Sequence, residues 1–169
     1  MATLSAPRRP WLSPRSLGVL ALSLVVCFGA AQLGSLATTP NLAPWYAGLE
    51  KPWFNPPNIA FPIAWSILFA LMAVAAWRVA MLSEGGERTR ALGVFALQLA
   101  LNIGWSFCFF WARSPLLGMI EVVPFFLAIL WTIARFRPID GLAAALLWPY
   151  AAWVAFAAAL NAAILHLNG

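Results

Sequence analysis

The sequence predicts an all-α integral membrane protein, a bundle of five transmembrane helices with a long ordered loop between the first two. Hydrophobic residues make up 63% of the 169 residues and charged residues only 9%, so a water-soluble globule of this composition would leave too much apolar surface uncovered. A window of about 19 residues finds five apolar runs long enough to cross a hydrocarbon layer of about 30 Å. Because most breaks between runs are short, consecutive helices are expected to pack antiparallel in one bundle.

The five helices are predicted in one domain, residues 16–169, after a basic amino-terminal extension, residues 1–15. Their expected ranges are about 16–37, 59–82, 91–112, 115–134 and 141–165. The first run follows arginines and so has a second interpretation as a signal peptide, but no convincing small-residue cleavage site precedes a soluble domain. Before the second helix, Asn55 is expected as the cap and Pro56 as the first helical residue.

Basic residues gather at one end of the predicted bundle. Only Lys51 and Arg113 are predicted at the opposite end. The first end carries eight arginines: Arg8, Arg9, Arg15, Arg78, Arg88, Arg90, Arg135 and Arg137. The positive-inside rule therefore predicts a cytoplasmic amino terminus and places the first loop and the carboxy terminus outside the cytoplasm. The net charge of +5 does not indicate a nucleic-acid partner, because the basic residues form no dense patch interspersed with polar side chains that could contact bases.

The cysteines and the single histidine predict neither a disulfide nor a metal site. Cys27 and Cys108 differ in predicted depth by about 9 Å, which exceeds ordinary disulfide reach. His166, at the last turn of the fifth helix, is more simply an interfacial side chain than a haem or metal ligand. Without a second histidine or a carboxylate cluster, we expect no metal ion and no required cofactor.

The longest connection, residues 38–58, is interpreted as a stiff lid. Trp45, Tyr46, Trp53 and Phe54 are apolar enough to require burial. Five prolines fix φ along the connection, so it loses little entropy when it packs: Pro40, Pro44, Pro52, Pro56 and Pro57. The alternative, an aromatic belt at the headgroup level, explains the tryptophans but not the prolines.

Polar and aromatic side chains beneath this lid share helix faces. Gln98, Asn102 and Trp105 lie on one face of the third helix, and Tyr150, Trp153, Ala157 and Asn161 lie on one face of the fifth. Counted at 1.5 Å per residue, Trp65, Asn102, Trp105 and Trp153 lie within about 9 to 18 Å of the loop end. We therefore expect these four side chains to converge in one leaflet.

Two interpretations of these polar and aromatic groups remain open. Asn102 and Asn161 serve either as hydrogen-bonding links between helices or as ligand contacts. Trp65 and Trp153 either fill the core or line a pocket. Glu121, the only carboxylate inside a predicted span, is either a neutral or water-exposed acid near the interface or a polar ligand contact.

Small residues recur along the third helix. Ala96, Ala100 and Gly104 follow one another at four-residue spacing, which lets two helices approach closely. This pattern favours a homodimer through the third helix, with close packing inside the bundle as the alternative.

Three blocks of the sequence resemble the tryptophan-rich sensory protein family, also called the translocator protein or peripheral-type benzodiazepine receptor family. The first block contains Trp45-Tyr46, Leu49, Lys51-Pro52, Pro56-Pro57, Phe61-Pro62 and Trp65. The second contains Gln98 to Asn102, Trp105 and Phe109-Phe110, and the third contains Pro149-Tyr150, Trp153, Phe156-Ala157 and Leu160-Asn161. The resemblance covers the chain from the first to the fifth helix.

This resemblance implies a pocket for flat hydrophobic ligands under the first loop. The family's ligands are porphyrins such as protoporphyrin IX, haem, sterols and benzodiazepine-like drugs. The implied ligand-binding residues are Trp65, Asn102, Trp105, Trp153 and Ala157, with Trp53 as a lid contact. Rim contacts are expected from Trp45, Lys51, Glu121 and Tyr150, of which Lys51 is the nearest cation for a propionate. The resemblance also implies a homodimer.

The resemblance favours a membrane receptor or sensor for tetrapyrroles that regulates tetrapyrrole or stress responses. One alternative is a porphyrin transporter, although the chain lacks an obvious inverted repeat. The other is a light-dependent porphyrin-degrading enzyme, for which the resemblance implicates Trp65 and Trp153. Sterol transport is not expected, because residues 160–166 contain no tyrosine followed by a basic residue. The charge bias favours a bacterial cell membrane, while relatives in outer membranes leave that location open.

Overall fold

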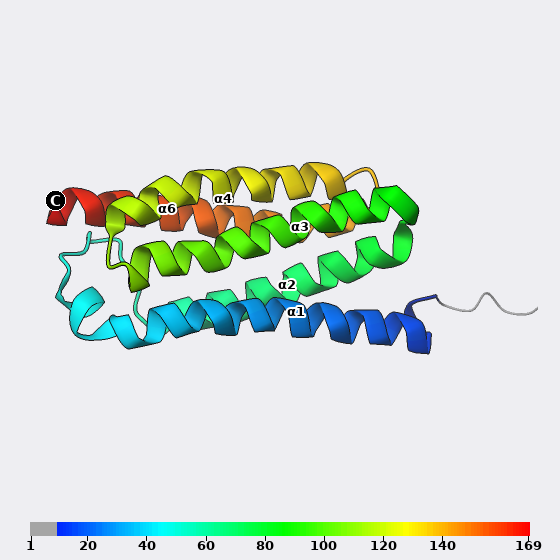
Figure 1. The fold of residues 1–169 in the computed structure, drawn as a ribbon, viewed down its shortest axis with the longest axis horizontal. Helices are drawn as coiled ribbons and strands as arrows, with labels where there is room; N and C mark the ends of the chain where they lie inside the picture. The colour runs from blue at the N-terminus through cyan, green and yellow to red at the C-terminus, as the bar shows by residue number, and fades with distance from the viewer. Residues whose placement is uncertain (1–9) are drawn as a thin grey trace, which may run out of the picture.

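The computed structural model describes residues 10–169, which form helices and turns and contain no strand. Five helical segments in this range are long and apolar enough to cross a membrane: Pro14–Tyr46, Ala60–Leu82, Gly85–Trp111, Pro115–Phe136 and Gly141–Asn168. They run side by side, and chain neighbours are antiparallel (Figure 1). The predicted fold class, an all-α bundle with five membrane-spanning segments, is confirmed.

Residues 10–169 contain ten helical elements. η1 (Pro10–Leu12) precedes the first span, which consists of α1 (Pro14–Thr38), η2 (Thr39–Asn41) and η3 (Leu42–Tyr46), and the second span is α2 (Ala60–Leu82). The third combines α3 (Gly85–Ser106) with the wider π-helical turn η4 (Phe107–Trp111), the fourth is α4 (Pro115–Phe136), and the fifth is divided into α5 (Gly141–Ala145) and α6 (Trp148–Asn168). Side chains cap three of these helices, because Ser13, Ser114 and Asp140 each accept a hydrogen bond from a backbone N–H of the first turn.

The third helix begins at Gly85, six residues before the predicted start at 91. The prediction followed hydropathy, which finds the apolar part of a helix and not its polar first turn. Glu87 lies in that first turn, where an acidic side chain is favourable, and Arg88 donates to the backbone carbonyl of Ser83. The helix therefore extends beyond its apolar run.

The expected cap of the second helix is also wrong. The helix begins at Ala60, and Asn55 lies in a preceding turn. There its side-chain oxygen accepts from the Tyr46 hydroxyl at 3.4 Å and its nitrogen donates to the Pro56 carbonyl at 3.1 Å. Two consecutive prolines disfavour a helical backbone at the residues before them, which explains the later start.

The fifth span is interrupted at Leu146 and Leu147, within the predicted range 141–165. Pro149 has no N–H with which to bond the Ala145 carbonyl, so one helix ends and another begins. The buried Leu147 occupies the break. The short α5 can thereby pack against α2 while α6 packs against α4.

The helices form a closed ring in the order α1, α2, α5 with α6, α4 and α3. α1 contacts both α2 and α3, α3 contacts α4, α4 contacts α6, and α2 contacts α5. The connection 39–59 and the carboxy terminus lie at one end of the ring, and the turn between α2 and α3 lies at the other (Figure 1). Most of the buried apolar side chains form one core near the ring centre, and a smaller aromatic cluster lies at the loop end.

The amino-terminal segment packs on the arginine-rich end of the bundle. Trp11 contacts Trp77 edge to face at 5.1 Å, and the Trp77 indole N–H donates to the Ser16 carbonyl and hydroxyl at 3.0 Å. The predicted extension, residues 1–15, differs from this arrangement because Ser13 caps α1 and Arg15 lies inside it. Residues 1–9 of that extension, with Arg8 and Arg9, lie outside the described residues.

An ion pair between Arg78 and Asp140 joins α2 to the start of α5. We expect Asp140→Ala to lower the thermal unfolding midpoint in detergent by several degrees, because it removes both the ion pair and a helix cap worth about 1 kcal/mol. Asp140→Asn keeps the cap and should lower the midpoint less. Equal shifts for the two variants would contradict a capping role.

The same pair predicts a pH dependence. The hydrogen bond from Arg78 holds the pKa of Asp140 below its ordinary value of 3.8. A depressed carboxyl pKa contributes stability that is present at neutral pH and is lost as pH falls through the folded-state pKa. The difference in midpoint between wild type and Asp140→Asn should therefore be constant near neutrality and shrink below about pH 4.

Candidate ligand-binding site

A cavity of about 730 Å³ lies inside the ring at the loop end, between α1, α2, α3 with η4, and α6. The connection 39–59 covers it. Six of the residues singled out in the sequence line this cavity: Lys51, Trp65, Asn102, Trp105, Trp153 and Ala157. Helical spacing had placed four of them at similar depth, and the ring brings those four faces together.

Aromatic rings form the walls of the cavity. On the side between α2 and α6, Trp153 contacts Phe61 edge to face at 6.0 Å and Phe156 at 5.6 Å. Trp65 packs on Phe69 at 5.6 Å. These rings fill the interface that the broken fifth span leaves between α2 and α6, and they present apolar faces to the cavity.

The opposite wall depends on the π-helical turn η4. Its wider hydrogen bonding, with the Ala112 N–H donating to the Phe107 carbonyl at 2.9 Å, changes the direction of the side chains after Trp105. Phe109 consequently stacks on Trp105 at 5.1 Å with the rings 13° apart, and Phe110 meets Trp105 edge to face at 5.9 Å. A regular α-helical period read from the sequence would not place both phenylalanines against this tryptophan.

A buried hydrogen-bond network forms the floor. The Tyr150 hydroxyl donates to Gln98 Oε1 at 2.8 Å and accepts from Asn102 Nδ2 at 3.0 Å. All three side chains are buried. Asn102 is thus a link between helices and a lining residue at once, and its Oδ1 makes no hydrogen bond with residues 10–169.

Asn161 ties α6 to the first turn of α4. In the amide orientation that satisfies both of its polar atoms, the nitrogen donates to the Pro115 carbonyl at 3.0 Å and the oxygen accepts from the Met119 N–H at 2.9 Å. Gly118 permits this contact, since a Cβ there would lie 2.9 Å from both the Asn161 side-chain amide and Phe109 Cδ2. Asn161 lines the cavity, but both polar atoms of its amide are hydrogen-bonded to the backbone of α4.

The mouth of the cavity carries a positive charge. Lys51 Nζ donates to the Leu49 carbonyl at 3.0 Å and lies 4.7 Å from the centre of the Tyr46 ring. No carboxylate in residues 10–169 forms an ion pair with it. The ammonium group is therefore held at the rim and remains available to an anionic group of a ligand.

Reciprocal hydrogen bonds hold the lid against the end of α6. The Glu50 N–H donates to Asn168 Oδ1 and Asn168 Nδ2 donates to the Glu50 carbonyl, both at 2.9 Å. On the opposite side Arg113 Nε donates to Asn41 Oδ1 at 3.0 Å. Arg113 has φ of +52°, which turns the chain sharply between η4 and α4. The lid is thus fixed to two different spans.

Four of the expected site residues lie elsewhere. The Trp53 side chain is 95% exposed and contacts Phe54, so it does not reach the cavity. Trp45 packs on Phe109 at 5.5 Å behind the lining, and Tyr150 belongs to the floor network without lining the cavity itself. Glu121 lies beside Gly104, outside the lining, and its carboxylate oxygens have no hydrogen-bond partner among residues 10–169.

The wall formed by α1 was not predicted. Ala31, Gln32, Ser35 and Thr38 line the cavity from this helix. Their signal in the sequence is a row of small and polar residues at three- and four-residue spacing within an apolar run. Ser35 and Thr39 also share a hydrogen bond at 3.0 Å between their hydroxyls.

The cavity lining is mostly apolar and aromatic. No aspartate, glutamate or histidine in the described chain lines the cavity. Residues 10–169 contain no group of three or more His, Cys, Asp or Glu side chains that would hold a metal ion. What the cavity offers is an apolar slot with aromatic walls, several amide and hydroxyl groups, and one cation at the mouth.

Comparison with known proteins identifies the family. The family model described as TspO/MBR matches residues 21–167, which extend from α1 into α6 and include the whole cavity. The chain belongs to the TspO/MBR family. The resemblance found in the three sequence blocks is thereby confirmed, and the protein is an integral multi-pass membrane protein of this family.

TspO/MBR relatives from distant organisms match most of the chain. A tryptophan-rich protein TspO of Chlorobaculum tepidum is 42% identical over 153 residues, which cover 88% of this chain and 95% of the relative. A tryptophan-rich sensory protein of Cereibacter sphaeroides is 37% identical, covering 86% and 88%. The human translocator protein is 36% identical over 120 residues, covering 69% and 70%.

The floor network generates a stability prediction. Tyr150→Phe removes the hydroxyl that bridges Gln98 and Asn102, and leaving these buried amides unpaired costs about 1 to 3 kcal/mol. We expect a fall of several degrees in the thermal unfolding midpoint in detergent. Tyr46→Phe, which removes a hydroxyl with one 3.4 Å contact, is the matched control and should shift the midpoint less. Equal shifts would disprove the importance of the network.

Proposed function

We propose that this TspO/MBR protein is a membrane receptor that binds tetrapyrroles, such as protoporphyrin IX or haem, in the cavity under the lid. The observation that carries the proposal is the cavity of about 730 Å³ with tryptophan walls and a lysine at its mouth. Its volume falls within the range of about 300 to 1,000 Å³ typical of small-molecule sites.

The chemistry of a tetrapyrrole matches each part of this cavity. Its large π-surface favours stacked or edge-on aromatic neighbours, which Trp65 and Trp153 supply from opposite sides of the α2–α6 interface. A propionate at its edge pairs with the unpaired Lys51 ammonium at the mouth. A pyrrole N–H can donate to Asn102 Oδ1. No cofactor beyond the ligand itself is part of the proposal.

Occupancy of the cavity acts through the lid in this proposal. The lid is held by a few hydrogen bonds to α6 and to Arg113 in the turn between η4 and α4, and it contacts the cavity directly through Tyr46 and Lys51. A ligand that touches the lid changes the stability of these bonds and thereby signals its presence. Such a receptor would regulate tetrapyrrole or stress responses.

A light-dependent enzyme is the second candidate function, and the position of two tryptophans favours it. Trp65 and Trp153 both line the cavity, where an indole is oxidisable by a photoexcited porphyrin. A porphyrin transporter is a weaker candidate. Neither an inverted repeat nor a break at the middle of a span is apparent in the described helices, since the interruption at Leu146 lies near the start of the fifth span.

We place the arginine-rich end of the bundle in the cytoplasm of a bacterial cell. Arg78, Arg88, Arg90, Arg135 and Arg137 lie at or near the ends of α2, α3 and α4 on this side of the bundle, and Lys51 and Arg113 lie in the connections at the other end. The positive-inside rule supports this orientation, with the lid and the carboxy terminus outside. Insertion into the cell membrane follows from the same charge bias.

A homodimer through α3 is the proposed assembly. Ala96 and Ala100 are exposed on the surface of the bundle, and Gly104 is partly buried beside Glu121. Ala96 and Ala100 thus place small side chains on the outer surface of α3, whereas Gly104 packs close to Glu121 of α4. An outward stripe of small residues favours close approach of a second α3.

A titration with protoporphyrin IX tests the receptor. We expect saturable quenching of tryptophan fluorescence when the purified protein in neutral detergent is titrated in the dark. Ala157→Trp fills the cavity and should weaken binding about tenfold or more, since overpacking costs about 1 to 3 kcal/mol. Ala155→Trp places the same ring on the exposed side of α6 and is the control. Absence of saturable binding by the wild type would overturn the tetrapyrrole proposal.

The same samples under light separate receptor from enzyme. A receptor leaves the porphyrin absorbance spectrum unchanged beyond the bleaching seen without protein. An enzyme yields a new absorbing product that disappears in Trp153→Phe and persists in Trp148→Phe, an exposed tryptophan outside the cavity.

The dimer is tested by a bulky residue on the stripe. We expect Ala100→Trp to reduce the dimer fraction measured by light scattering in detergent, because the ring prevents close approach of two α3 helices. Ala155→Trp on α6 should leave that fraction unchanged. A monomeric wild type in both detergent and lipid nanodiscs would refute the proposed assembly.

A further inference from the structure

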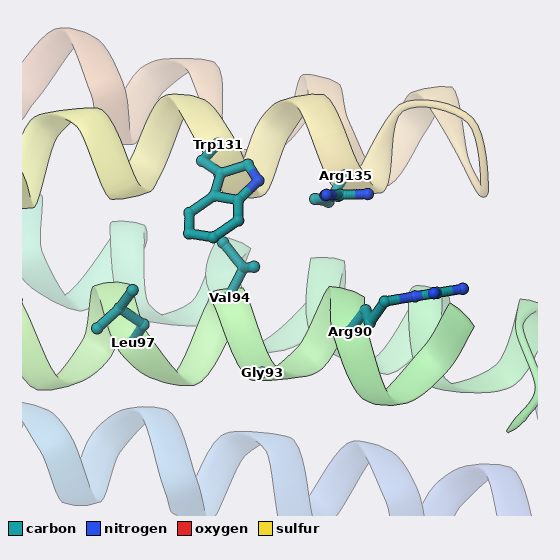
Figure 2. A pocket seen from close by; sticks show the side chains of 6 residues that line it. All are labelled: Arg90, Gly93, Val94, Leu97, Trp131 and Arg135. Atoms are coloured by element: carbon teal, nitrogen blue, oxygen red, sulfur yellow. The ribbon is translucent and has the colours of Figure 1, made fainter. Parts of the chain in front are cut away.

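A second cavity lies on the outer face of the bundle, at the arginine-rich end. It is a groove of about 320 Å³ between α3 and α4 and shares no lining residue with the cavity under the lid. α3 contributes Arg90, Gly93, Val94 and Leu97, and α4 contributes Trp131 and Arg135. In Figure 2, Trp131 reaches from α4 toward Val94, and both arginines lie nearer to the end of the bundle.

Both arginines carry uncompensated charge. Arg78, at the same end, is paired with Asp140, and Arg88 donates to the Ser83 carbonyl. Arg90 and Arg135 form no hydrogen bond or ion pair with any residue in the range 10–169. The Arg135 guanidinium carbon lies 6.0 Å from the centre of the Trp131 ring, which directs this cation along the groove. The groove thus has two free guanidinium groups and an aromatic wall.

The groove changes from charged to apolar with depth. Arg135 lies in the last turn of α4 and Arg90 lies in the second turn of α3, so both are at headgroup level. At 1.5 Å per residue, Val94, Leu97 and Trp131 lie about 6 to 10 Å deeper. Gly93 leaves the backbone bare between them, and a Cβ built there meets no atom within 4 Å. The groove is therefore open to a chain that runs into the hydrocarbon region.

We propose that this groove binds an anionic phospholipid of the adjacent leaflet, with its phosphate between Arg90 and Arg135 and an acyl chain against Gly93, Leu97 and Trp131. Guanidinium groups form charge-assisted hydrogen bonds with phosphate oxygens, and a net negative headgroup adds long-range attraction that a zwitterionic one lacks. The positive-inside rule places this end at the cytoplasmic leaflet, where anionic lipids are enriched.

A second copy of the chain fits this groove less well than a lipid does. Two α3 helices related by an axis along the membrane normal would face one another with the same residues. Contact along Ala96 and Ala100 is apolar and small, but contact extended to Arg90 would bring two like charges together. Leu97 of the groove lies between Ala96 and Ala100 along α3, so a dimer seam along these alanines borders the groove. The like charges of Arg90 leave the arginine side of the groove to lipid.

Native mass spectrometry of the full chain tests the proposal. The protein in neutral detergent is mixed with equal amounts of phosphatidylglycerol and phosphatidylcholine of identical acyl chains. We expect the wild type to retain phosphatidylglycerol preferentially. The double variant Arg90→Gln/Arg135→Gln should lose that preference by about fivefold for each arginine. Arg137→Gln, an exposed arginine at the same end but outside the groove, is the matched control and should retain it.

A second variant tests the apolar part of the site. Gly93→Leu keeps both charges and fits without a clash, so it should fold normally while its side chain fills the groove. We expect it to lose bound phosphatidylglycerol as the double variant does. Unchanged thermal midpoints for both variants exclude a loss of fold as the cause.

Three outcomes would overturn the proposal. One is equal loss of preference in the double variant and in Arg137→Gln, which would indicate a diffuse attraction to the whole arginine-rich end. Another is displacement of the lipid by millimolar inorganic phosphate at constant ionic strength, which would assign the arginines to a soluble anion. The third is a lipid-free dimer whose fraction changes in the double variant, which would assign the groove to a second copy.

Discussion

The hydrogen bonds of Tyr150 with Gln98 and Asn102 are the constraint on which the rest of the structure depends. They join α6 to α3 across the inside of the ring, between helices that are not ring neighbours. An unpaired amide is costly in an interior that excludes water. The three side chains must therefore lie at the same depth, and α3 and α6 must each be rotated about its axis so that these side chains meet. That setting directs Trp153 and Ala157 of α6, and Trp105 of α3, toward a common space above the network. The cavity is thus the volume left open once the polar groups below it are satisfied.

Irregular backbone segments also position the side chains of the bundle interior. The break at Leu146 lets α5 close the ring against α2 while α6 turns toward α4, and aromatic rings fill the interface that remains. The π-helical turn η4 brings two phenylalanines onto Trp105, and the positive φ of Arg113 returns the chain into α4. Gly118 then admits the Asn161 amide. The π-helical turn, Arg113 and Gly118 lie near the cavity, whereas the break at Leu146 lies toward the arginine-rich end, and each lets the chain or a side chain adopt a position that a regular helix would not permit.

The sequence predicted the parts of the molecule that depend on periodicity and hydropathy. Five apolar runs gave the spans, and helical spacing grouped Trp65, Asn102, Trp105 and Trp153, which the structure places around one cavity. The sequence did not predict which way individual side chains point. Trp53 is aromatic and lies in the lid, yet its side chain points into solvent, because composition cannot say which face of a loop is buried. The α1 wall was overlooked since its small and polar residues give no strong pattern, and the polar first turn of α3 was taken for a loop.

The link between Glu50 and Asn168 has a consequence for how the molecule is made. It joins residues 118 positions apart, so the contact closes a longer loop than the one of 72 residues between Asn41 and Arg113. A membrane protein is synthesised and inserted from its amino terminus, and the first four helices can assemble while α6 is still in the ribosome. During that interval the lid has no partner at the end of α6, and one wall of the cavity does not exist. The cavity is therefore complete only once the final span has been inserted, and the aromatic interior is exposed to lipid until then.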